Sequence, residues 1–257
     1  MSAVLRVRGL CKSFGGVEAV SDVSFDVNKG EFLALIGPNG AGKTTCFNML
    51  GGYLRPDRGS VQLNELEIAG IAPRKIVRLG VGRTFQITRT FLSMTVRENV
   101  QMALIAHHKK MYDLVTRATR LYVSEAEALL KLVSMVEQGE RACSELAYGD
   151  LKRLELAIAL AHDPALLLMD EPTAGMAPSE RLALMELTAT IVAEKGVSVL
   201  FTEHDMDVVF AHSHRILVLN RGQLIAEGTG AEIRENALVQ EVYLGGGTVF
   251  AEAAADA

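Results

Sequence analysis

The sequence predicts an α/β fold in which a helical lobe is inserted into a core of mainly parallel strands. Residues 32–36 and 165–169 are continuous apolar runs, which are typical of strands buried on both faces of a parallel sheet. The first run ends at a glycine-rich loop, and the second ends at two carboxylates, Asp170 and Glu171. Between them, residues 91–160 change to the spacing of amphipathic helices. Ligand chemistry is therefore expected where the strands end.

Composition limits the possible classes of protein. The 257 residues, 49% of them apolar, suffice for one large core or for a core with a smaller lobe. A formal charge of −5 with scattered basic residues argues against a broad nucleic-acid surface, so no nucleic-acid partner is expected. Three distant cysteines suggest neither a disulfide framework nor a metal site. With no apolar run of membrane-spanning length and no signal-peptide pattern, we expect a cytoplasmic protein that meets a membrane only through partners.

The loop after residues 32–36 has the spacing of a phosphate-binding loop. Its glycines let backbone N–H groups surround phosphate oxygens, and the helix that follows directs its positive end at the anion. Lys43 would contact the β- and γ-phosphates, and the Thr44 hydroxyl would bind Mg²⁺. The pattern predicts a site for a nucleoside triphosphate. The expected binding residues are Gly37, Pro38, Asn39, Gly40, Ala41, Gly42, Lys43, Thr44 and Thr45.

Two half-buried strands are predicted at residues 4–7 and 23–27, where apolar and polar residues alternate. Phe14 lies between them, and its ring is suited either to stacking on an adenine or to ordinary core packing. After the phosphate loop, Gly51 and Gly52 are expected to end the helix.

A further strand, residues 80–86, would deliver Gln86 to its end. A neutral amide there can sense Mg²⁺ or the attacking water, although a lone glutamine is more often a surface residue.

The predicted helical lobe has two capping-box signatures, Thr95 with Glu98 and Ser124 with Glu127. The next apolar positions are expected to form one core face, comprising Leu129, Leu132, Val133 and Val136. Residues 145–150 then precede a strong helix, and their small residues beside a helix N-terminus predict a second place for an anion.

The second apolar strand supplies the candidate catalytic carboxylates. Asp170 would hold Mg²⁺ through water, and Glu171, on the other side of the pleat, would orient or deprotonate the attacking water. Another buried strand, residues 197–202, leads to His204, which is placed to contact the γ-phosphate. The alternative is a strand capped by solvated acids, which Lys43 elsewhere in the chain makes less favourable.

Later elements complete the predicted core. A helix is expected from Pro178 to Lys195 with Gly196 as its cap, followed by a hairpin whose turn is residues 220–222. The tail beyond residue 245, rich in Gly and Ala, is expected to be mobile.

Together these motifs resemble the ATP-binding cassette (ABC) ATPases, over almost the whole chain. Residues 37–45 resemble Walker A, Gln86 the Q-loop, residues 166–170 Walker B, Glu171 the catalytic glutamate, and His204 the switch histidine. Phe14 matches the aromatic residue that stacks on adenine. The family signature corresponds to residues 146–150, including Ala147, Tyr148 and Gly149.

The resemblance implies a P-loop core with an antiparallel β-subdomain and an inserted helical subdomain. The implied domain covers residues 1–245, with residues 1–90 and 161–245 as the core and 91–160 as the lobe. ATP and Mg²⁺ are the implied cofactors, with Thr44, Gln86 and Asp170 as the metal-binding residues. Lys43 would act with Gln86, Glu171 and His204 in catalysis.

Within the family, the chain is most similar to the ATPase subunits of branched-chain amino acid importers. The residues that carry this resemblance are 83–86, 146–150, 174–176 and 242–245. Such subunits dock on two integral-membrane permeases at the cytoplasmic face, pair head to tail with a second ATPase, and receive substrate indirectly from an extracytoplasmic binding protein. The signature residues Ala147 to Gly149 would act on the partner's ATP. Ala147, Leu151 and Ala177 depart from the usual Ser, Gln and Asp or Asn.

Two alternatives remain at this stage. One keeps the transporter but changes its cargo to urea, amides, aromatic acids or an exported lipid, since the cargo does not touch this subunit. The other is a soluble ABC mechanoenzyme acting on DNA or ribosomes. The single cassette and the lack of a heptad insertion make it the weaker hypothesis.

Overall fold

The computed structural model describes residues 2–84, 90–110 and 118–244, and it confirms the predicted α/β fold with two sheets. The main sheet has the order β10-β9-β3-β8-β7-β6, and its strands are parallel except for β10, which pairs antiparallel to β9. Its strands are β3 (Phe32–Ile36), β6 (Val81–Thr84), β7 (Leu166–Asp170), β8 (Ser198–Thr202), β9 (Arg215–Asn220) and β10 (Gln223–Gly228).

The second sheet is the antiparallel subdomain, with the order β2-β1-β4-β5. Alternation along its strands buries Leu5 and Val7 on one and Phe25 and Val27 on the next, as predicted. The strands are longer than the sequence indicates. They are β1 (Ala3–Phe14), β2 (Val17–Asn28), β4 (Arg58–Leu63) and β5 (Leu66–Glu67).

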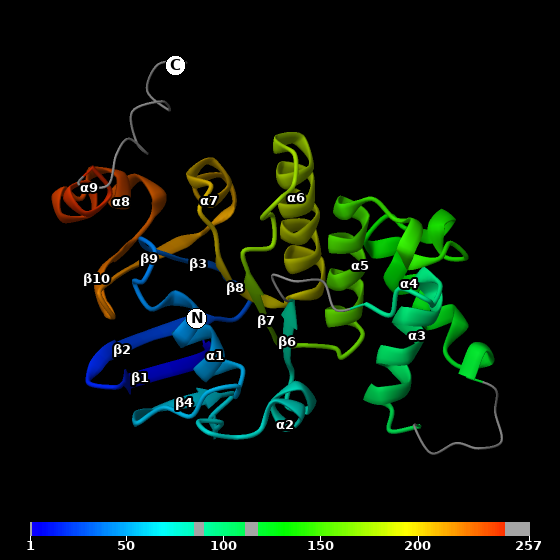
Figure 1. The fold of residues 1–257 in the computed structure, drawn as a ribbon, viewed down its shortest axis with the longest axis horizontal. Helices are drawn as coiled ribbons and strands as arrows, with labels where there is room; N and C mark the ends of the chain where they lie inside the picture. Colours follow the sequence, from blue (N-terminus) through cyan, green and yellow to red (C-terminus); the bar gives the residue numbers. More distant parts are fainter. Residues whose placement is uncertain (1, 85–89, 111–117, 245–257) are drawn as a thin grey trace.

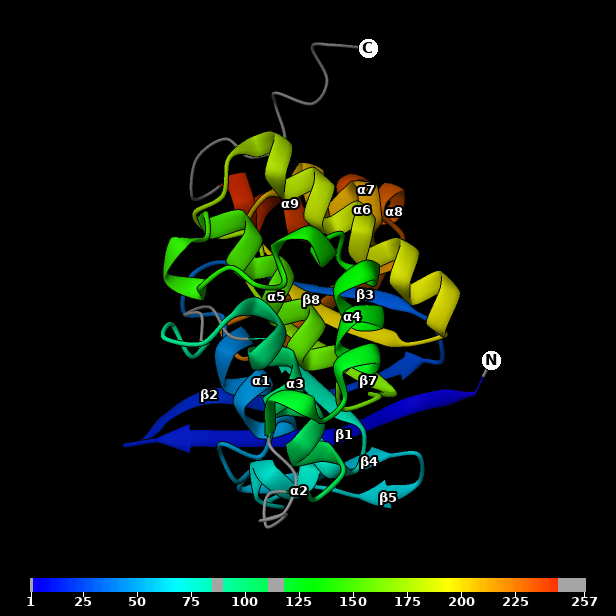
Figure 2. The ribbon, with the colours of Figure 1, turned by 90° about the vertical axis from the view of Figure 1, so that its right-hand side faces the viewer.

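The helices cover the main sheet and form a lobe at one end of it (Figures 1 and 2). Helix α1 lies between the two sheets, whereas α6 and α7 cover the opposite face and α3 to α5 group together beyond β6. The longer helices are α1 (Lys43–Leu50), α3 (Val96–His107), α4 (Val123–Leu132), α5 (Tyr148–Leu160), α6 (Pro178–Lys195) and α9 (Ala237–Leu244). The short ones are α2 (Pro73–Arg78), α7 (Met206–His212) and α8 (Gly230–Glu235).

Strand β3 shows how the main sheet divides the core. Its alternate residues Leu33 and Leu35 pack with α1 and the antiparallel sheet, while Phe32, Ala34 and Ile36 pack with the helices on the other face. Every residue of β3 is buried, which explains why its sequence is apolar throughout.

Two details of the predicted lobe are wrong. The Thr95 capping box is present, with Thr95 Oγ1 accepting from the Glu98 N–H at 3.2 Å, but the N-cap residue of α4 is Tyr122 and not Ser124. Helix α4 starts at Val123, because Tyr122 reverses the chain at φ 58° and stacks on His108, so Ser124 already lies inside the first turn. Val136 is 47% exposed because α4 ends before it.

Elements outside the lobe agree with the prediction. Gly51 caps α1, Gly196 caps α6 with φ 66°, and Arg221 and Gly222 make the tight turn between β9 and β10 with positive φ. Among the described residues, no helix is both long and apolar enough to cross a bilayer. The division of the chain into core and lobe at residues 91 and 160 remains a prediction.

Candidate nucleotide-binding site

The phosphate loop joins β3 to α1 as predicted, and two of its glycines are required by close backbone contacts. A Cβ at Gly37 would lie 2.1 Å from the Leu219 carbonyl oxygen, and one at Gly42 would lie 2.4 Å from that of Ala19. Both residues also have φ values in the region that favours glycine, 154° and 106°. The loop is therefore packed against β9 and β2 from behind, which fixes the side that faces a ligand.

A cavity of about 200 Å³ opens in front of this loop. It is lined by Ala19, Asn39, Gly40, Ala41, Gly42, Lys43, Thr44, Thr45 and Glu171. The first N–H groups of α1 have no partner within the helix, so the helix end supplies donors and a positive partial charge there. Most of the predicted binding loop and the predicted catalytic carboxylate thus share one cavity.

Lys43 is held against the loop itself. Its ammonium nitrogen donates to the Gly37 carbonyl at 2.6 Å and to the Pro38 carbonyl at 3.1 Å, and the residue is only 7% exposed. Burial lowers the Lys43 pKa, while the charges of Glu171 and Asp170 act in the opposite direction. The buried Lys43 ammonium group lies close to the backbone N–H groups at the start of α1. Together these donors form a site suited to polyphosphate oxygens.

The consecutive acids at the end of β7 have different environments. Asp170 is 9% exposed, and its Oδ1 accepts from the Thr202 hydroxyl at 2.9 Å while its Oδ2 contacts Arg83 at 3.3 Å. Glu171 leaves the strand in the left-handed conformation, at φ 49°, and lines the cavity. Its N–H lies 3.1 Å from both the carbonyl and the hydroxyl oxygens of Thr202.

Glu171 and His204 lie next to each other in the structure. His204 Nε2 is 2.8 Å from Glu171 Oε1, and both side chains remain partly exposed. Next to them, Glu203 is buried and accepts from the Thr173 N–H and hydroxyl at 2.8 and 2.7 Å. Burial raises the pKa of Glu203, and its hydrogen bonds act against that shift.

Arg83 and Thr202 are the site residues that sequence reasoning missed. Arg83 reaches Asn48 Oδ1 at 3.0 Å as well as Asp170, so it ties β6 and α1 to β7. Thr202, in β8, connects both Asp170 and Glu171 to the neighbouring strand. A polar residue at the end of a buried strand was the available signal in each case.

The residues present fit ATP better than they define a metal site. Thr44 is exposed on the cavity, but Asp170 is engaged by Thr202 and Arg83 and does not line it. Gln86 lies outside the described residues. Within those residues, no group of three or more His, Cys, Asp or Glu side chains is arranged to hold a metal ion. The Mg²⁺ roles of Thr44, Gln86 and Asp170 remain predictions.

Phe14 is 49% exposed, so the alternative that it packs in the core is wrong. Its ring lies 5.6 Å from the Lys12 ammonium at the end of β1. An exposed aromatic ring is available for stacking, and its contact with adenine remains a prediction.

The predicted signature residues lie at the start of α5, away from the phosphate cavity. Ala147 and Tyr148 are exposed, while a Cβ at the buried Gly149 would approach Glu180 Oε1 at 3.2 Å. None of these three is among the residues that line the cavity of the same chain.

The C-terminal helix α9 reaches the phosphate loop. A hydrogen bond from the Gly37 backbone acts to lower the pKa of Tyr243, although burial, the larger effect, raises it overall. The motif of residues 242–245 therefore has one residue, Tyr243, in contact with the first glycine of the loop.

The site consists of a glycine loop between a buried parallel strand and a helix, and a carboxylate and a histidine from adjacent strand ends face this loop. This arrangement defines the class of nucleoside triphosphate-binding α/β proteins. The comparisons with known proteins go further. Residues 20–174 match the model of the ABC transporter family, and residues 223–248 match that of the branched-chain amino acid ATP-binding cassette transporters. The chain belongs to the ABC transporter family, as an ATP-binding cassette ATPase.

Its relatives include two curated transport proteins. The chain is 42% identical over 252 residues to the high-affinity branched-chain amino acid transport ATP-binding protein LivG of Salmonella typhimurium, and 40% identical to BraF of Pseudomonas aeruginosa, which has the same description. Each alignment covers 94% of this chain and 98% of the relative. Among solved structures, MJ1267, an ATP-binding cassette of an ABC transporter in its ADP conformation, aligns with a TM-score of 0.85 and 30% identity, covering 95% of this chain and 100% of that one.

Proposed function

We propose that this chain is the ATP-hydrolysing subunit of a membrane importer for branched-chain or related hydrophobic amino acids. The names of the relatives LivG and BraF and the match of residues 223–248 support this cargo. No observation favours urea, amides, aromatic acids or an exported lipid, and none favours a mechanoenzyme on DNA or ribosomes. The ATPase role is supported by the position of Glu171, which lines the phosphate-loop cavity together with Lys43 and contacts His204.

In this proposal the residues of one chain bind and orient ATP. Lys43 and the N-terminal turn of α1 hold the β- and γ-phosphates, and the Phe14 ring stacks on adenine. Bound Mg²⁺, held by Thr44 and, through water, by Asp170, with Gln86 as a further contact, would neutralise phosphate charge. Glu171 accepts the proton of the attacking water, and His204 fixes the Glu171 carboxylate and contacts the γ-phosphate.

The site would be completed by a second ATPase subunit, either a paralogue or another copy. Ala147 and Tyr148 are exposed at the start of α5, and neither they nor the buried Gly149 line the cavity of their own chain. In a head-to-tail dimer, the start of α5 would instead approach the partner's ATP. With alanine at residue 147, backbone N–H groups and the helix dipole would supply that contact.

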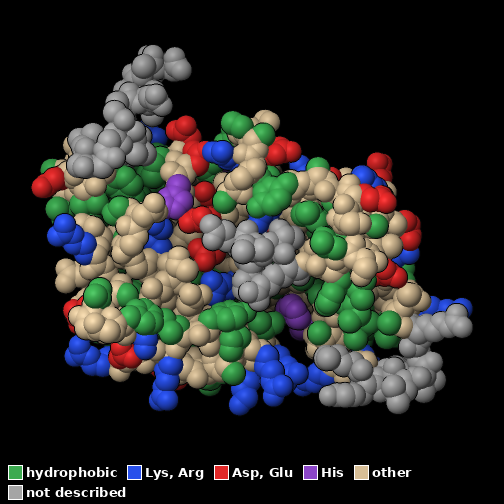
Figure 3. Space-filling model, in the orientation of Figure 1, with side chains coloured by type: hydrophobic (Ala, Val, Ile, Leu, Met, Phe, Trp, Pro, Cys, Tyr) green, Lys and Arg blue, Asp and Glu red, His purple; other side chains and the backbone are tan. Residues whose placement is uncertain are grey.

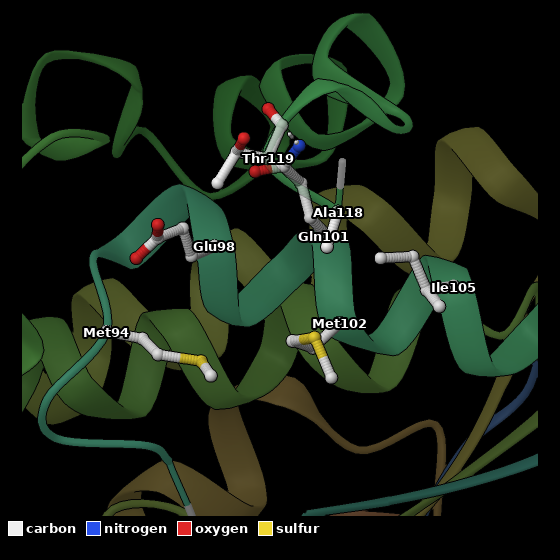
Figure 4. A pocket seen from close by; sticks show the side chains of 7 residues that line it. All are labelled: Met94, Glu98, Gln101, Met102, Ile105, Ala118 and Thr119. Atoms are coloured by element: carbon white, nitrogen blue, oxygen red, sulfur yellow. Dashed lines mark hydrogen bonds between the residues drawn. The ribbon is translucent and has the colours of Figure 1, made fainter. Parts of the chain in front are cut away.

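The permease subunits would dock on the helical lobe. Phe91 and Leu92 are adjacent and are 56% and 55% exposed, so together they offer an apolar contact surface. Met94 follows them and lines a small hollow along α3 with Met102 (Figure 4). A permease loop seated here would place the subunit peripherally on the cytoplasmic side of the membrane, with the extracytoplasmic binding protein as an indirect partner.

The substitution Glu171→Gln tests the ATPase role. It keeps the shape of the side chain but removes the base, so the purified variant should bind ATP, form a stable dimer and lose most turnover, on the order of a hundredfold or more. Glu194→Gln, an exposed change near the end of α6, is the matched control and should retain parental turnover. Near-normal hydrolysis by Glu171→Gln would remove Glu171 from the base role.

The cargo requires a separate experiment, because no residue here touches it. The chain should co-purify with its permeases, and the binding protein of that assembly should hold leucine, isoleucine or valine in preference to urea, amides or aromatic acids. Tight binding of an unrelated ligand would overturn the cargo and leave the ATPase role intact.

A further inference from the structure

Positive charge is concentrated in one segment of this acidic chain. Between Glu67 and Glu98 the sequence contains six basic residues and no Asp or Glu, although the formal charge of the whole chain is −5. The basic residues of this segment are Arg74, Lys75, Arg78, Arg83, Arg89 and Arg97. Arg83 serves the nucleotide site, where it contacts Asp170, but α2 carries three others that have no part in that site.

Helix α2 presents these three charges to solvent. Ile76, which is 1% exposed, anchors the helix to the core, whereas Arg74, Lys75 and Arg78 are exposed. Positions 74 and 75 are four and three residues before 78, so the three side chains share one side of the helix.

Arg55 extends this side of the molecule. A Cβ at Gly70 would lie 3.3 Å from Arg55 Cγ, so the stem of Arg55 crosses the chain three residues before α2 begins. The set Arg55, Arg74, Lys75 and Arg78 is termed here the α2 basic face. In Figure 3, Lys and Arg side chains gather along the lower edge of the molecule, where Figure 1 places α2 and β4.

The charges of the α2 basic face are not neutralised within the part of the chain that the structure describes. None of its four residues forms an ion pair with another described residue. Of the acids close in sequence, Asp57 is bound by Lys12 at 2.6 Å, and Glu67 accepts backbone N–H groups at 2.9 and 3.0 Å. The face is therefore available to an external anionic partner.

Exposed apolar side chains accompany the charges. Leu79, directly after α2, is 37% exposed, and Tyr53, two residues before Arg55, is 49% exposed. Basic residues close in sequence to a tyrosine and a leucine are typical of protein surfaces that bind the lipid headgroup layer. There the charged groups contact lipid phosphates, and the rings and alkyl groups lie deeper in the layer.

We propose that the α2 basic face binds the anionic phospholipid surface of the bilayer beside the permeases. The inference goes beyond the proposed function and rests on it only for the position of the subunit next to a membrane. Acidic permease loops are a poorer match, because the cytoplasmic loops of integral-membrane proteins are enriched in Lys and Arg and would repel this face. Nucleic acid is also disfavoured, since about four phosphate contacts give weak binding at physiological salt.

Vesicle flotation with the full-length purified subunit tests this proposal. Vesicles of phosphatidylcholine alone are compared with vesicles that also contain phosphatidylglycerol, at about 50 mM and about 300 mM salt. Binding is expected only to the anionic vesicles and is expected to weaken at the higher salt. Each basic residue contributes about fivefold to the partition coefficient, so the triple variant R74Q, K75Q and R78Q should bind about a hundredfold more weakly.

A control variant removes the same charge from scattered exposed positions, K29Q, K131Q and K195Q. It should float like the parent protein, and both variants should keep parental ATPase activity, which separates this test from that of the proposed function. Equal loss in the two variants, or equal binding to neutral vesicles, would overturn the proposal. So would displacement by millimolar inorganic phosphate, which indicates a free-anion site, or tighter binding to a short DNA duplex than to anionic vesicles.

Discussion

Thr202 connects both acids of the nucleotide site, so Thr202→Val is the substitution with the most direct structural prediction. Valine has nearly the same shape, and the side chain is fully buried. The change removes the hydrogen bond from the Thr202 hydroxyl to Asp170 Oδ1 at 2.9 Å, while the Glu171 N–H keeps the Thr202 carbonyl at 3.1 Å. Losing one hydrogen bond to a buried carboxylate costs about 2 kcal/mol of unfolding free energy.

That loss corresponds to a decrease of roughly 4–8 °C in Tm for a domain of this size. Urea denaturation and thermal melting measure it, and ATP turnover should also fall because Asp170 loses one of its two orienting partners. Thr202→Ser is the control: it keeps the hydroxyl, costs about 1 kcal/mol for the lost methyl group, and should retain turnover. The reasoning fails if Thr202→Val is as stable and active as the parent, or if Thr202→Ser loses turnover to the same extent.

Three further predictions concern other parts of the site and fold. Tyr243→Phe removes the contact with the Gly37 backbone and should weaken ATP binding about threefold to tenfold in equilibrium titration, whereas Tyr122→Phe should have no effect. Burial and the nearby His107 lower the pKa of His162 in the folded chain. The contribution of His162 to the free energy of unfolding is therefore fully present above the ordinary histidine pKa and is lost as the pH falls toward the lowered value. In urea denaturation, His162→Gln should reduce the decrease in the free energy of unfolding between about pH 7.5 and about pH 5.5. Ala147→Ser should change ATPase activity less than about threefold if backbone N–H groups carry the signature contact, and a large gain would show that the hydroxyl matters.

The phosphate loop was predictable because local rules specify it almost completely. Gly37 and Gly42 need conformations that glycine alone adopts easily, and the flanking strand and helix follow from their apolar patterns. Thr95 and Glu98 form a reciprocal cap that depends only on residues three apart. Where the structure follows from neighbours in sequence, the prediction and the structure agree.

Predictions failed where distant residues decide the outcome. Ser124 has the spacing of a cap, but the stack of Tyr122 on His108 accompanies a start of α4 two residues earlier than that cap requires. The contact of Arg83 with Asp170 joins residues 87 positions apart, so the polar residue in a buried strand could mark Arg83 but could not identify its partner. Phe14 illustrates a third case, because only the register of β1 and β2 decides whether its ring is buried or exposed.

The different environments of Asp170 and Glu171 follow from one turn of the backbone. Asp170 is the last residue of β7 and remains in the sheet, where Thr202 and Arg83 satisfy both of its oxygens. Glu171 leaves the sheet at φ 49°, which directs its carboxylate toward the phosphate cavity and His204. Because a non-glycine residue adopts this conformation only at a cost in free energy, the contacts of its N–H with Thr202 must stabilise it. Thr202 thus both orients the buried Asp170 and holds the turn that directs Glu171 into the cavity, so its replacement should impair turnover more than the loss of stability alone explains.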